Sequence, residues 1–164
     1  MTKTVSVRLA KINDAASIAA MLARLAHDLG DTEFQTTAEI VRESGFDARR
    51  LYHCQIASVD GKDVGVALYF RNFSTTKACP GVYVQDLWVD DAARGAGIGQ
   101  ELLAAVVKHA VNDWQAAYLK LTVHTHNPDA ERFYTRLGFT ANLEDRPMVL
   151  AGEDFTKLQS TAQG

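Results

Sequence analysis

The chain has 164 residues, and 17 Lys and Arg against 20 Asp and Glu leave a net charge of -3. We expect a single domain over residues 1–164, since domains cluster at roughly 100–150 residues. The mild acidity argues against a general nucleic-acid binder, which would present a basic face. No stretch approaches the ~20 apolar residues of a membrane span. The start has no apolar run of signal-peptide length, so we expect a cytoplasmic protein.

Neither the cysteines nor the histidines predict a metal centre. Cys54 and Cys79 are interpreted as reduced thiols of a cytosolic protein. His124 and His126 are two residues apart on a strand-like segment and so share a face, but no third ligand is evident. A structural metal needs more ligands at short spacing, and we expect none.

The first elements alternate between strand and helix periodicity. Val5–Leu9 alternates and predicts a strand. Asn13 or Asp14 is expected to cap the helix that follows, and Gly30 to end it. Apolar residues at helical spacing give this helix a buried face. The face consists of Ile18, Met21, Leu22, Leu25 and Leu29.

A second short helix and a three-stranded meander are expected next. Thr36 and Glu39 are spaced as in a capping box and open the helix, which ends near Gly45. The segments after it are rich in Val, Ile, Tyr and Phe and are separated by turn residues. The strands are predicted at Tyr52–Val59, Val64–Arg71 and Val82–Val89, with turns at Asp60-Gly61-Lys62 and Pro80-Gly81.

The second half returns to helices, and Pro128 suits a first helical turn. The predicted elements are a helix from about Gly97 to Trp114, a strand at Tyr118–Thr125, a helix from Pro128 to about Leu137, and a final strand or pair between Phe139 and Leu150. We expect the tail after Asp154 to be frayed. The order β-α-α-β-β-β-α-β-α-β predicts an α/β fold, a mixed sheet with helices on both faces. The strands flanking the long helix should be parallel neighbours.

A run of three alternating glycines lies between a predicted strand and the long helix. Its sequence is Val89-Asp90-Asp91-Ala92-Ala93-Arg94-Gly95-Ala96-Gly97-Ile98-Gly99. Backbone N–H groups without covering side chains converge there at a helix N-terminus, where the dipole adds roughly half a positive charge. Arg94 adds a full charge with planar donors. The combination predicts a pyrophosphate site.

Other interpretations of the glycines fit the spacing less well. No Lys followed by Ser or Thr comes after the last glycine, so the Walker A pattern fails. The spacing is G-x-G-x-G after a meander, whereas the dinucleotide fingerprint needs G-x-G-x-x-G within a βαβ unit. The glycines could also only close a tight turn, although one or two would suffice for that.

The segment Arg94-Gly95-Ala96-Gly97-Ile98-Gly99 resembles the acetyl-CoA pyrophosphate loop, Arg/Gln-x-x-Gly-x-Gly/Ala, of the GCN5-related N-acetyltransferase (GNAT) superfamily. Asn127-Pro128 and Phe133-Tyr134-x-x-Leu137-Gly138-Phe139 are similar to its second signature. The resemblance covers about residues 5–150. It implies a central, mostly antiparallel sheet flanked by helices. It also implies direct acetyl transfer from acetyl-CoA to an amine, with no covalent enzyme intermediate.

A narrower resemblance points to the diamine (spermidine/spermine) acetyltransferase branch. It is carried by Leu51-Tyr52-His53-Cys54, by the strand Val64–Phe70 and by Tyr83–Val89. That branch typically has Glu where Gln85 stands, and the glutamate would hold a cationic amine or relay its proton. The branch implies a diamine, polyamine or lysine-like acceptor, and a homodimer.

The resemblance also implies roles for single residues. Tyr134 would face the CoA sulfur and protonate the departing thiolate, although its helical spacing also fits a core aromatic. Asn127 resembles the position that binds the pantetheine arm, and it also suits a helix cap before Pro128. The backbone of Leu87-Trp88-Val89 would contact the pantetheine amides, because this strand splays from its neighbour in the family.

An alkyl amine with a pKa near ~10.4 is almost fully charged at neutral pH, so the site must accept a proton. Gln85, Asp86 and Asp28 are the candidates for contact with the amine. Alternation places Gln85, Leu87 and Val89 on one face of their strand, and Asp86 and Trp88 on the other. Each candidate for the substrate pocket or the proton path also has a plain structural interpretation as a paired, solvated or surface residue. These candidates are Asp86, His124, His126 and the loop residues His27, Asp28, Asp31 and Glu33.

Three functions are compatible with the sequence. The favoured one is an N-acetyltransferase of small-molecule amines. The second keeps the chemistry and changes the acceptor to a protein or aminoglycoside amine, since fold alone does not fix the substrate. The third is a non-catalytic acetyl-CoA-binding module, against which the intact Tyr134 and the complete glycine loop argue.

Overall fold

The computed structural model describes residues 4–162, and the chain divides into two compact units, Met1–His124 and Thr125–Gly164. Among the described residues, the first unit holds a five-stranded sheet with three α-helices, and the second holds two further α-helices. No helix in the described part is long and apolar enough to cross a membrane. Whether residues 1–164 form one domain stays a prediction.

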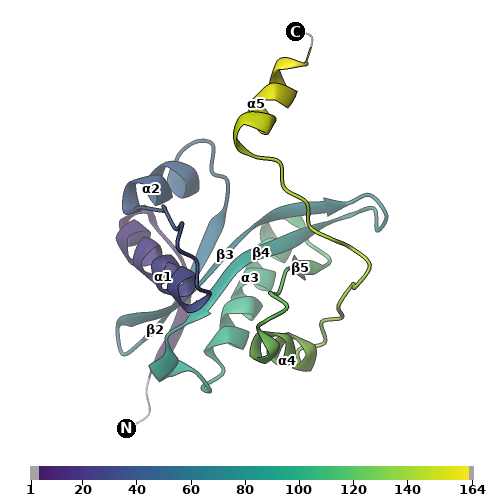
Figure 1. Ribbon diagram of the computed structural model, residues 1–164. Helices are drawn as coiled ribbons and strands as arrows, with labels where there is room; N and C mark the ends of the chain where they lie inside the picture. Colours follow the sequence, from purple (N-terminus) through teal and green to yellow (C-terminus); the bar gives the residue numbers. More distant parts are fainter. Residues whose placement is uncertain (1–3, 163–164) are drawn as a thin grey trace. The chain divides into compact units, whose positions relative to one another are not determined.

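The first unit follows the predicted order closely (Figure 1). Its elements are β1 (Val5–Leu9), α1 (Ala15–Asp28), α2 (Ala38–Phe46), β2 (His53–Val59), β3 (Lys62–Ser74), β4 (Cys79–Val89), α3 (Ile98–Trp114) and β5 (Leu119–Leu121). The strand order in the sheet is β1-β2-β3-β4-β5, antiparallel except that β4 and β5 are parallel. The predicted α/β class, the mostly antiparallel sheet and the parallel pair around the long helix are therefore confirmed.

Helices cover both faces of the sheet, with α1 and α2 on one and α3 on the other (Figure 1). The α1 and α2 side is a continuous apolar cluster because both helices carry a buried stripe at helical spacing. It joins Ile18, Leu22 and Val41 to Ile56 and Val66 of the sheet. This double covering explains why the middle of β2 and β3 is buried on both faces.

Two predicted helix caps differ in detail from the structure. Thr37, not Thr36, caps α2, and its hydroxyl accepts from the Ile40 N–H at 3.2 Å. Asp14 precedes α1 but caps no helical N–H. Its carboxylate instead accepts two 2.8 Å bonds from Arg8, because a charged guanidinium is a stronger partner than a neutral amide.

Pro80-Gly81 was predicted as a turn and lies inside β4, so that prediction is wrong. The turn falls between β3 and β4 at residues 75–78, and Ala78 takes a positive φ of 51° there. Gly81 serves close packing, because a Cβ at this position would collide with the ring of Tyr118. Its carbonyl also accepts from the Trp114 indole at 3.0 Å.

The second unit contains α4 (Pro128–Arg136) and α5 (Gly152–Ser160). The predicted strand between Phe139 and Leu150 is absent from the structure, and the tail predicted to fray forms α5 instead. Pro147 lacks the N–H that a sheet ladder needs, and Asn142 accepts from the Glu144 N–H in a local turn. The strand predicted at Tyr118–Thr125 is likewise shorter, since only Leu119–Leu121 pairs in the sheet.

Candidate active site

The sheet opens at the C-terminal end of β4. The parallel strand β5 pairs with β4 only from Val82 to Val84. Beyond that point the segment Asp86–Val89 pairs with β3 on one side only, which leaves a row of backbone donors and acceptors on the other. The unpaired edge that the resemblance implied for Leu87-Trp88-Val89 is therefore present.

A β-bulge lies where this opening begins. Tyr69 pairs with Val84 and Leu68 pairs with Asp86, so Gln85 is an extra residue in β4. Antiparallel partners share a face of the sheet. Before the bulge, Val84 therefore shares the α3 face with Tyr69, whose hydroxyl is 2.9 Å from His109 of that helix.

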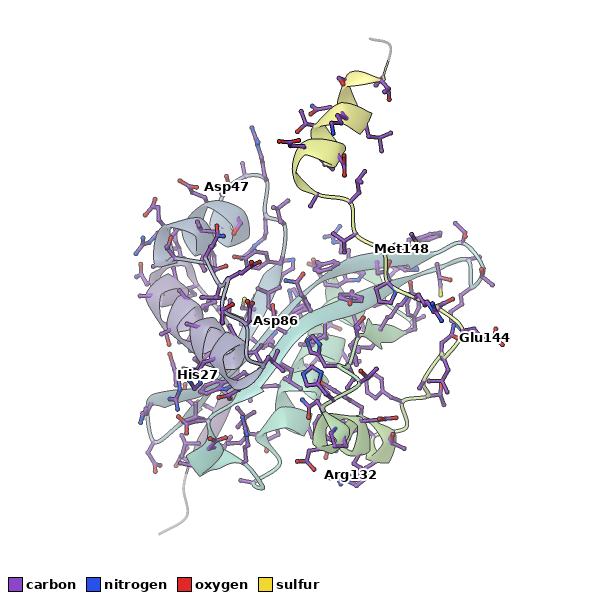
Figure 2. All side chains as sticks on the ribbon, viewed as in Figure 1. His27, Asp47, Asp86, Arg132, Glu144 and Met148 are labelled. Carbon is purple, nitrogen blue, oxygen red and sulfur yellow. The ribbon has the colours of Figure 1, made fainter. Side chains whose placement is uncertain are left out.

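After the bulge, the side chains of β4 change face. Asp86 and Trp88 share the α1 and α2 face with their partners Leu68 and Val66. Asp86 therefore points to the side of the sheet that carries α1 and α2, and it is labelled in Figure 2. The prediction that Asp86 and Trp88 share a face is confirmed. The bulge at Gln85 determines that this is the α1 and α2 face.

The glycine loop connects the open end of β4 to α3. Gly95 and Gly97 have φ of 82° and 78°, a backbone conformation that favours glycine, and a Cβ at either would meet nothing within 4 Å. Gly97 is the N-cap of α3 and makes no side-chain cap bond. In the described chain the backbone N–H groups of Gly95, Ala96, Gly97 and Ile98 have no protein acceptor. They are free to bind an anion at the positive end of the helix dipole.

Arg94 is held by acidic neighbours in the structure. Its Nε donates to the Val89 carbonyl at 2.9 Å, which fixes the side chain along the end of β4. Its two terminal nitrogens lie 3.3 Å from Asp28 and 2.5 Å from Asp91. All three side chains are more than one-third exposed, so each pair contributes only ~0–1 kcal/mol.

Asp28, a predicted substrate residue, lies at the last position of α1 and contacts Arg94 of the glycine loop. One carboxylate oxygen accepts from the Trp88 indole at 3.0 Å and from Arg94. These bonds, that of Trp88 first, lower the pKa of Asp28 despite its position at the negative end of a helix dipole. Arg24 of the same helix stacks on the Trp88 ring at 4.9 Å and pairs with Asp90 at 2.8 Å. The end of α1 is thus tied to the end of β4.

The predicted substrate pair Gln85 and Asp86 is in direct contact. The Gln85 amide donates to an Asp86 carboxylate oxygen at 3.3 Å. Burial raises the pKa of Asp86, and the Gln85 bond opposes that rise. A carboxylate with a raised pKa is a better proton acceptor near neutral pH.

The remaining polar candidates are spread over both units. Asp31 accepts from the Glu33 N–H at 2.8 Å, a local turn in the loop after α1. His27 lies in α1 itself, 3.8 Å from Asp28. His124 closes the first unit and His126 belongs to the second, both outside β5. The prediction that these two histidines share a strand face is therefore wrong.

The second unit carries Asn127 and Tyr134 on α4. Asn127 is the N-cap, and its side-chain oxygen accepts from the Ala130 N–H at 3.2 Å. The capping interpretation is confirmed, and the side-chain NH₂ keeps its donors. Tyr134 packs against Phe133 and Phe139, with ring centroids 5.1 and 5.3 Å away. Burial raises the pKa of Tyr134 to about 12, so its hydroxyl is protonated at neutral pH.

A cluster of rings on the α3 face was not expected from the sequence. His53, Tyr69, His109 and Trp114 pack together with centroid separations of 4.8 to 6.4 Å. Gln55 donates to the Tyr69 hydroxyl at 3.0 Å. The buried Nδ1 of His53 has no partner among the described residues. The four rings come from β2, β3 and α3, and no short motif predicts that they meet.

Both cysteines are free, and burial raises the pKa of the Cys54 thiol to about 12. In the described part of the chain, no group of three His, Cys, Asp or Glu side chains is arranged to hold a metal ion. The chemistry at hand is therefore that of the open strand edge, the glycine loop and the polar residues beside them.

Two proteins are similar to this chain in sequence, and one solved structure is similar to it in fold. A thialysine N-epsilon-acetyltransferase from Bos taurus is 31% identical over 143 residues, which is 82% of this chain and 83% of the relative. A spermine/spermidine N(1)-acetyltransferase from Bacillus subtilis is 28% identical over 87 residues, 52% of this chain and 57% of the relative. An aminoglycoside N-acetyltransferase solved in complex with CoA superposes with a TM-score of 0.72 at 17% identity, covering 93% of this chain and 97% of that structure.

The family comparison agrees with the fold and the loop. Residues 19–139 match the acetyltransferase (GNAT) family, a span that includes the bulge, the open edge of β4, the glycine loop and α4. The relatives are named N-acetyltransferases. The chain therefore belongs to the GNAT acetyltransferase family and is an N-acetyltransferase.

Proposed function

We propose that this enzyme moves the acetyl group of acetyl-CoA directly to a primary amine of a small molecule, which is a diamine, a polyamine or a lysine-like amine. The observation that carries the proposal is the opening of the sheet at Asp86–Val89, directly before the free N–H groups of the glycine loop. An extended ligand ending in a pyrophosphate fits this arrangement, since its amides meet a strand edge and its phosphates meet a helix N-terminus.

The residues present fit the pyrophosphate. The N–H groups of Gly95, Gly97 and Gly99, with Ala96 and Ile98 between them, provide the donors at the start of α3. Arg94 supplies the positive charge. Its exposed pairs with Asp28 and Asp91 are weak, so a doubly charged pyrophosphate competes well for the guanidinium.

The pantetheine arm would meet the open edge of β4. Leu87, Trp88 and Val89 offer backbone groups there, and the Trp88 side chain stays packed under α1. Within the second unit the Asn127 side-chain oxygen caps α4, so its NH₂ is the group of this residue that we propose for the pantetheine arm.

Two proton transfers accompany the reaction. The amine nitrogen forms the new bond to the acetyl carbon, the carbon–sulfur bond breaks, and the sulfur leaves with the electron pair. We assign the proton lost by the amine to Asp86, directly or through water, because burial raises the pKa of this carboxyl. Tyr134 gives its proton to the leaving thiolate, since its raised pKa keeps the hydroxyl protonated until then.

The decisive experiment is an assay of CoA release over a panel of amines. The panel contains spermidine, putrescine, lysine, thialysine and an aminoglycoside, with acetyl-CoA in excess. We expect turnover with small alkyl amines and the poorest turnover with the aminoglycoside. Binding of acetyl-CoA without turnover on any amine would instead support a non-catalytic module.

A homodimer and a cytoplasmic location belong to the same proposal. The dimer is expected from the resemblance to the diamine acetyltransferase branch. Light scattering on the purified chain tests it, with a mass near 36 kDa for the dimer against 18.0 kDa for one chain. Fractionation of the native host tests the location.

A further inference from the structure

A cavity of about 510 Å³ lies in the first unit, at the end of the sheet where β2 begins. Its lining includes two arginines, one carboxylate, one imidazole and two aromatic rings. These are Arg50, Arg71, Asp113, His53, Tyr52 and Phe70. All of the lining belongs to the loop after α2, to β2 and β3, and to the end of α3. None of the mechanism described above uses it.

Arg50 is the arginine with spare binding capacity. Its Nε donates to the Gly45 carbonyl at 2.9 Å and its guanidinium lies 5.5 Å from the Phe46 ring centroid. These contacts anchor the side chain to the end of α2, near Asp47 in Figure 2. In the described part of the chain no carboxylate pairs with Arg50, so its two terminal nitrogens keep their donors.

Arg71, in contrast to Arg50, already has a carboxylate partner. It pairs with Asp113 at 3.2 Å and stacks over the Trp114 ring at 5.2 Å. The cavity wall thus carries one paired and one unpaired guanidinium. Such a wall attracts a single carboxylate and repels a second ammonium group.

The cavity and the proposed amine site at Asp86 are connected by side chains on one face of β3. Phe70 lies two residues along β3 from Leu68, so the two share a face, and Leu68 pairs with Asp86. Diagonal neighbours of this kind are about 7–8 Å apart. Burial first, and nearby Cys54 and Asp86 after it, raise the pKa of Tyr52. Tyr52 and Phe70 therefore connect the cavity with Asp86.

We propose that the acceptor is a diamino acid, whose side-chain amine is acetylated beside Asp86 and whose α-carboxylate is bound by Arg50 in this cavity. The inference rests on the proposed function and names the substrate class of that site. The carboxylate of an extended lysine-like molecule is about 7 Å from its terminal amine, from bonds near 1.5 Å. With the amine at Asp86, this length places the carboxylate over Tyr52 and Phe70, in the cavity that Arg50 lines.

The same geometry disfavours polyamines. A polyamine bound with one amine at Asp86 would place a second ammonium group in the cavity that the Arg50 guanidinium lines. A desolvated ammonium group needs a carboxylate partner, and the Asp113 carboxylate is already paired with Arg71. The cavity therefore selects the carboxylate-bearing substrate over its decarboxylated counterpart.

Matched substrate pairs test this selection. Lysine and cadaverine differ only in the carboxylate, as do ornithine and putrescine. We expect Arg50→Gln to lower kcat/KM for lysine and ornithine ten- to a hundredfold, the value of a lost charge-assisted bond. Activity on cadaverine and putrescine should not fall, and it should rise because the Arg50 charge that repels their second ammonium group is gone. Arg50→Lys keeps the charge and should restore part of the selectivity.

Arg49→Gln is the control, because Arg49 is the adjacent exposed cation and is not part of the cavity lining. It should leave all four substrates unchanged, and thermal melting of each variant checks that the fold is intact. An equal loss for lysine and cadaverine in Arg50→Gln, or no loss for either, would overturn the inference. Efficient turnover of polyamines but of no amino acid would overturn it and leave the proposed function standing. No turnover on any amine would overturn both.

Discussion

Replacing Gly97 by alanine separates the two interpretations of the glycine loop. Gly97 has φ of 78° and ψ of 3°, a left-handed conformation, which costs an alanine about 1–2 kcal/mol. An added Cβ would meet nothing within 4 Å in the free protein. The only loss of stability should therefore be this backbone strain, which lowers Tm by about 2–6 °C for a chain of this size.

The loss of acetyl-CoA affinity should be larger than strain explains. The new methyl group would stand among N–H groups that have no acceptor in the described chain, so it would hold a phosphate oxygen away from them. Losing one charge-assisted hydrogen bond costs about 1.5–3 kcal/mol, or ten- to a hundredfold in Kd. Isothermal titration calorimetry with acetyl-CoA measures this change directly.

Gly61→Ala is the matched control. Gly61 has φ of 82°, and an added methyl group would also meet nothing within 4 Å, but this glycine lies in the turn between β2 and β3. The variant should lose the same stability and keep the parental Kd. If Gly97→Ala also kept the parental Kd, the glycines would only close a strand-to-helix turn, and the pyrophosphate assignment would be refuted.

Three further substitutions test Tyr134 as the proton donor, His53 in the ring cluster, and Gln85 of the bulge as a determinant of substrate specificity. Tyr134→Phe should lower kcat by roughly 10²–10⁴ with little change in acetyl-CoA affinity; a parental kcat would leave Tyr134 as a packing residue. Burial first lowers the pKa of His53 to about 4, so the folded state resists its protonation, and stability should fall as pH drops from about 6.5 to 4, by about 1–2 kcal/mol for this partly exposed ring. His53→Phe should flatten that part of the urea-denaturation stability curve, and an unchanged slope would contradict the assignment. Gln85→Glu should raise kcat/KM for spermidine selectively, by about tenfold or more; an equal change for lysine would argue against a role in specificity.

Periodicity predicted most elements of the first unit because burial decides them. The stripe that includes Ile18 and Leu22 faces the sheet, and α1 forms around it. The prediction failed at Gly81, where the same residue type that favours a turn is needed for the approach of the Tyr118 ring. Local sequence does not distinguish a glycine required by its backbone angle from one required by its neighbour.

The glycine loop was predictable because its chemistry is local, with donors and charge within a few consecutive residues. The cavity was not, because it depends on which distant strands pair. Arg50, Phe70 and Asp113 come from a loop, a strand and a helix, and only the register of the sheet and the packing of α3 bring them to one wall. Tyr52 and His53 were singled out only through a resemblance, which carries no statement about a pocket.

The bulge at Gln85 determines which face of the sheet carries Asp86. Without it, strict alternation along β4 would place Val82, Val84 and Asp86 on the same face, under α3 with Tyr69. The extra residue shifts the pairing from Tyr69–Val84 to Leu68–Asp86, so the carboxylate changes sides at the point where β5 stops pairing with β4. The open edge, the carboxylate and the cavity beyond Phe70 consequently adjoin one another. A substitution that removed the bulge would therefore reverse the facing of Asp86 together with that of Trp88, whose indole donates to Asp28 beside Arg94.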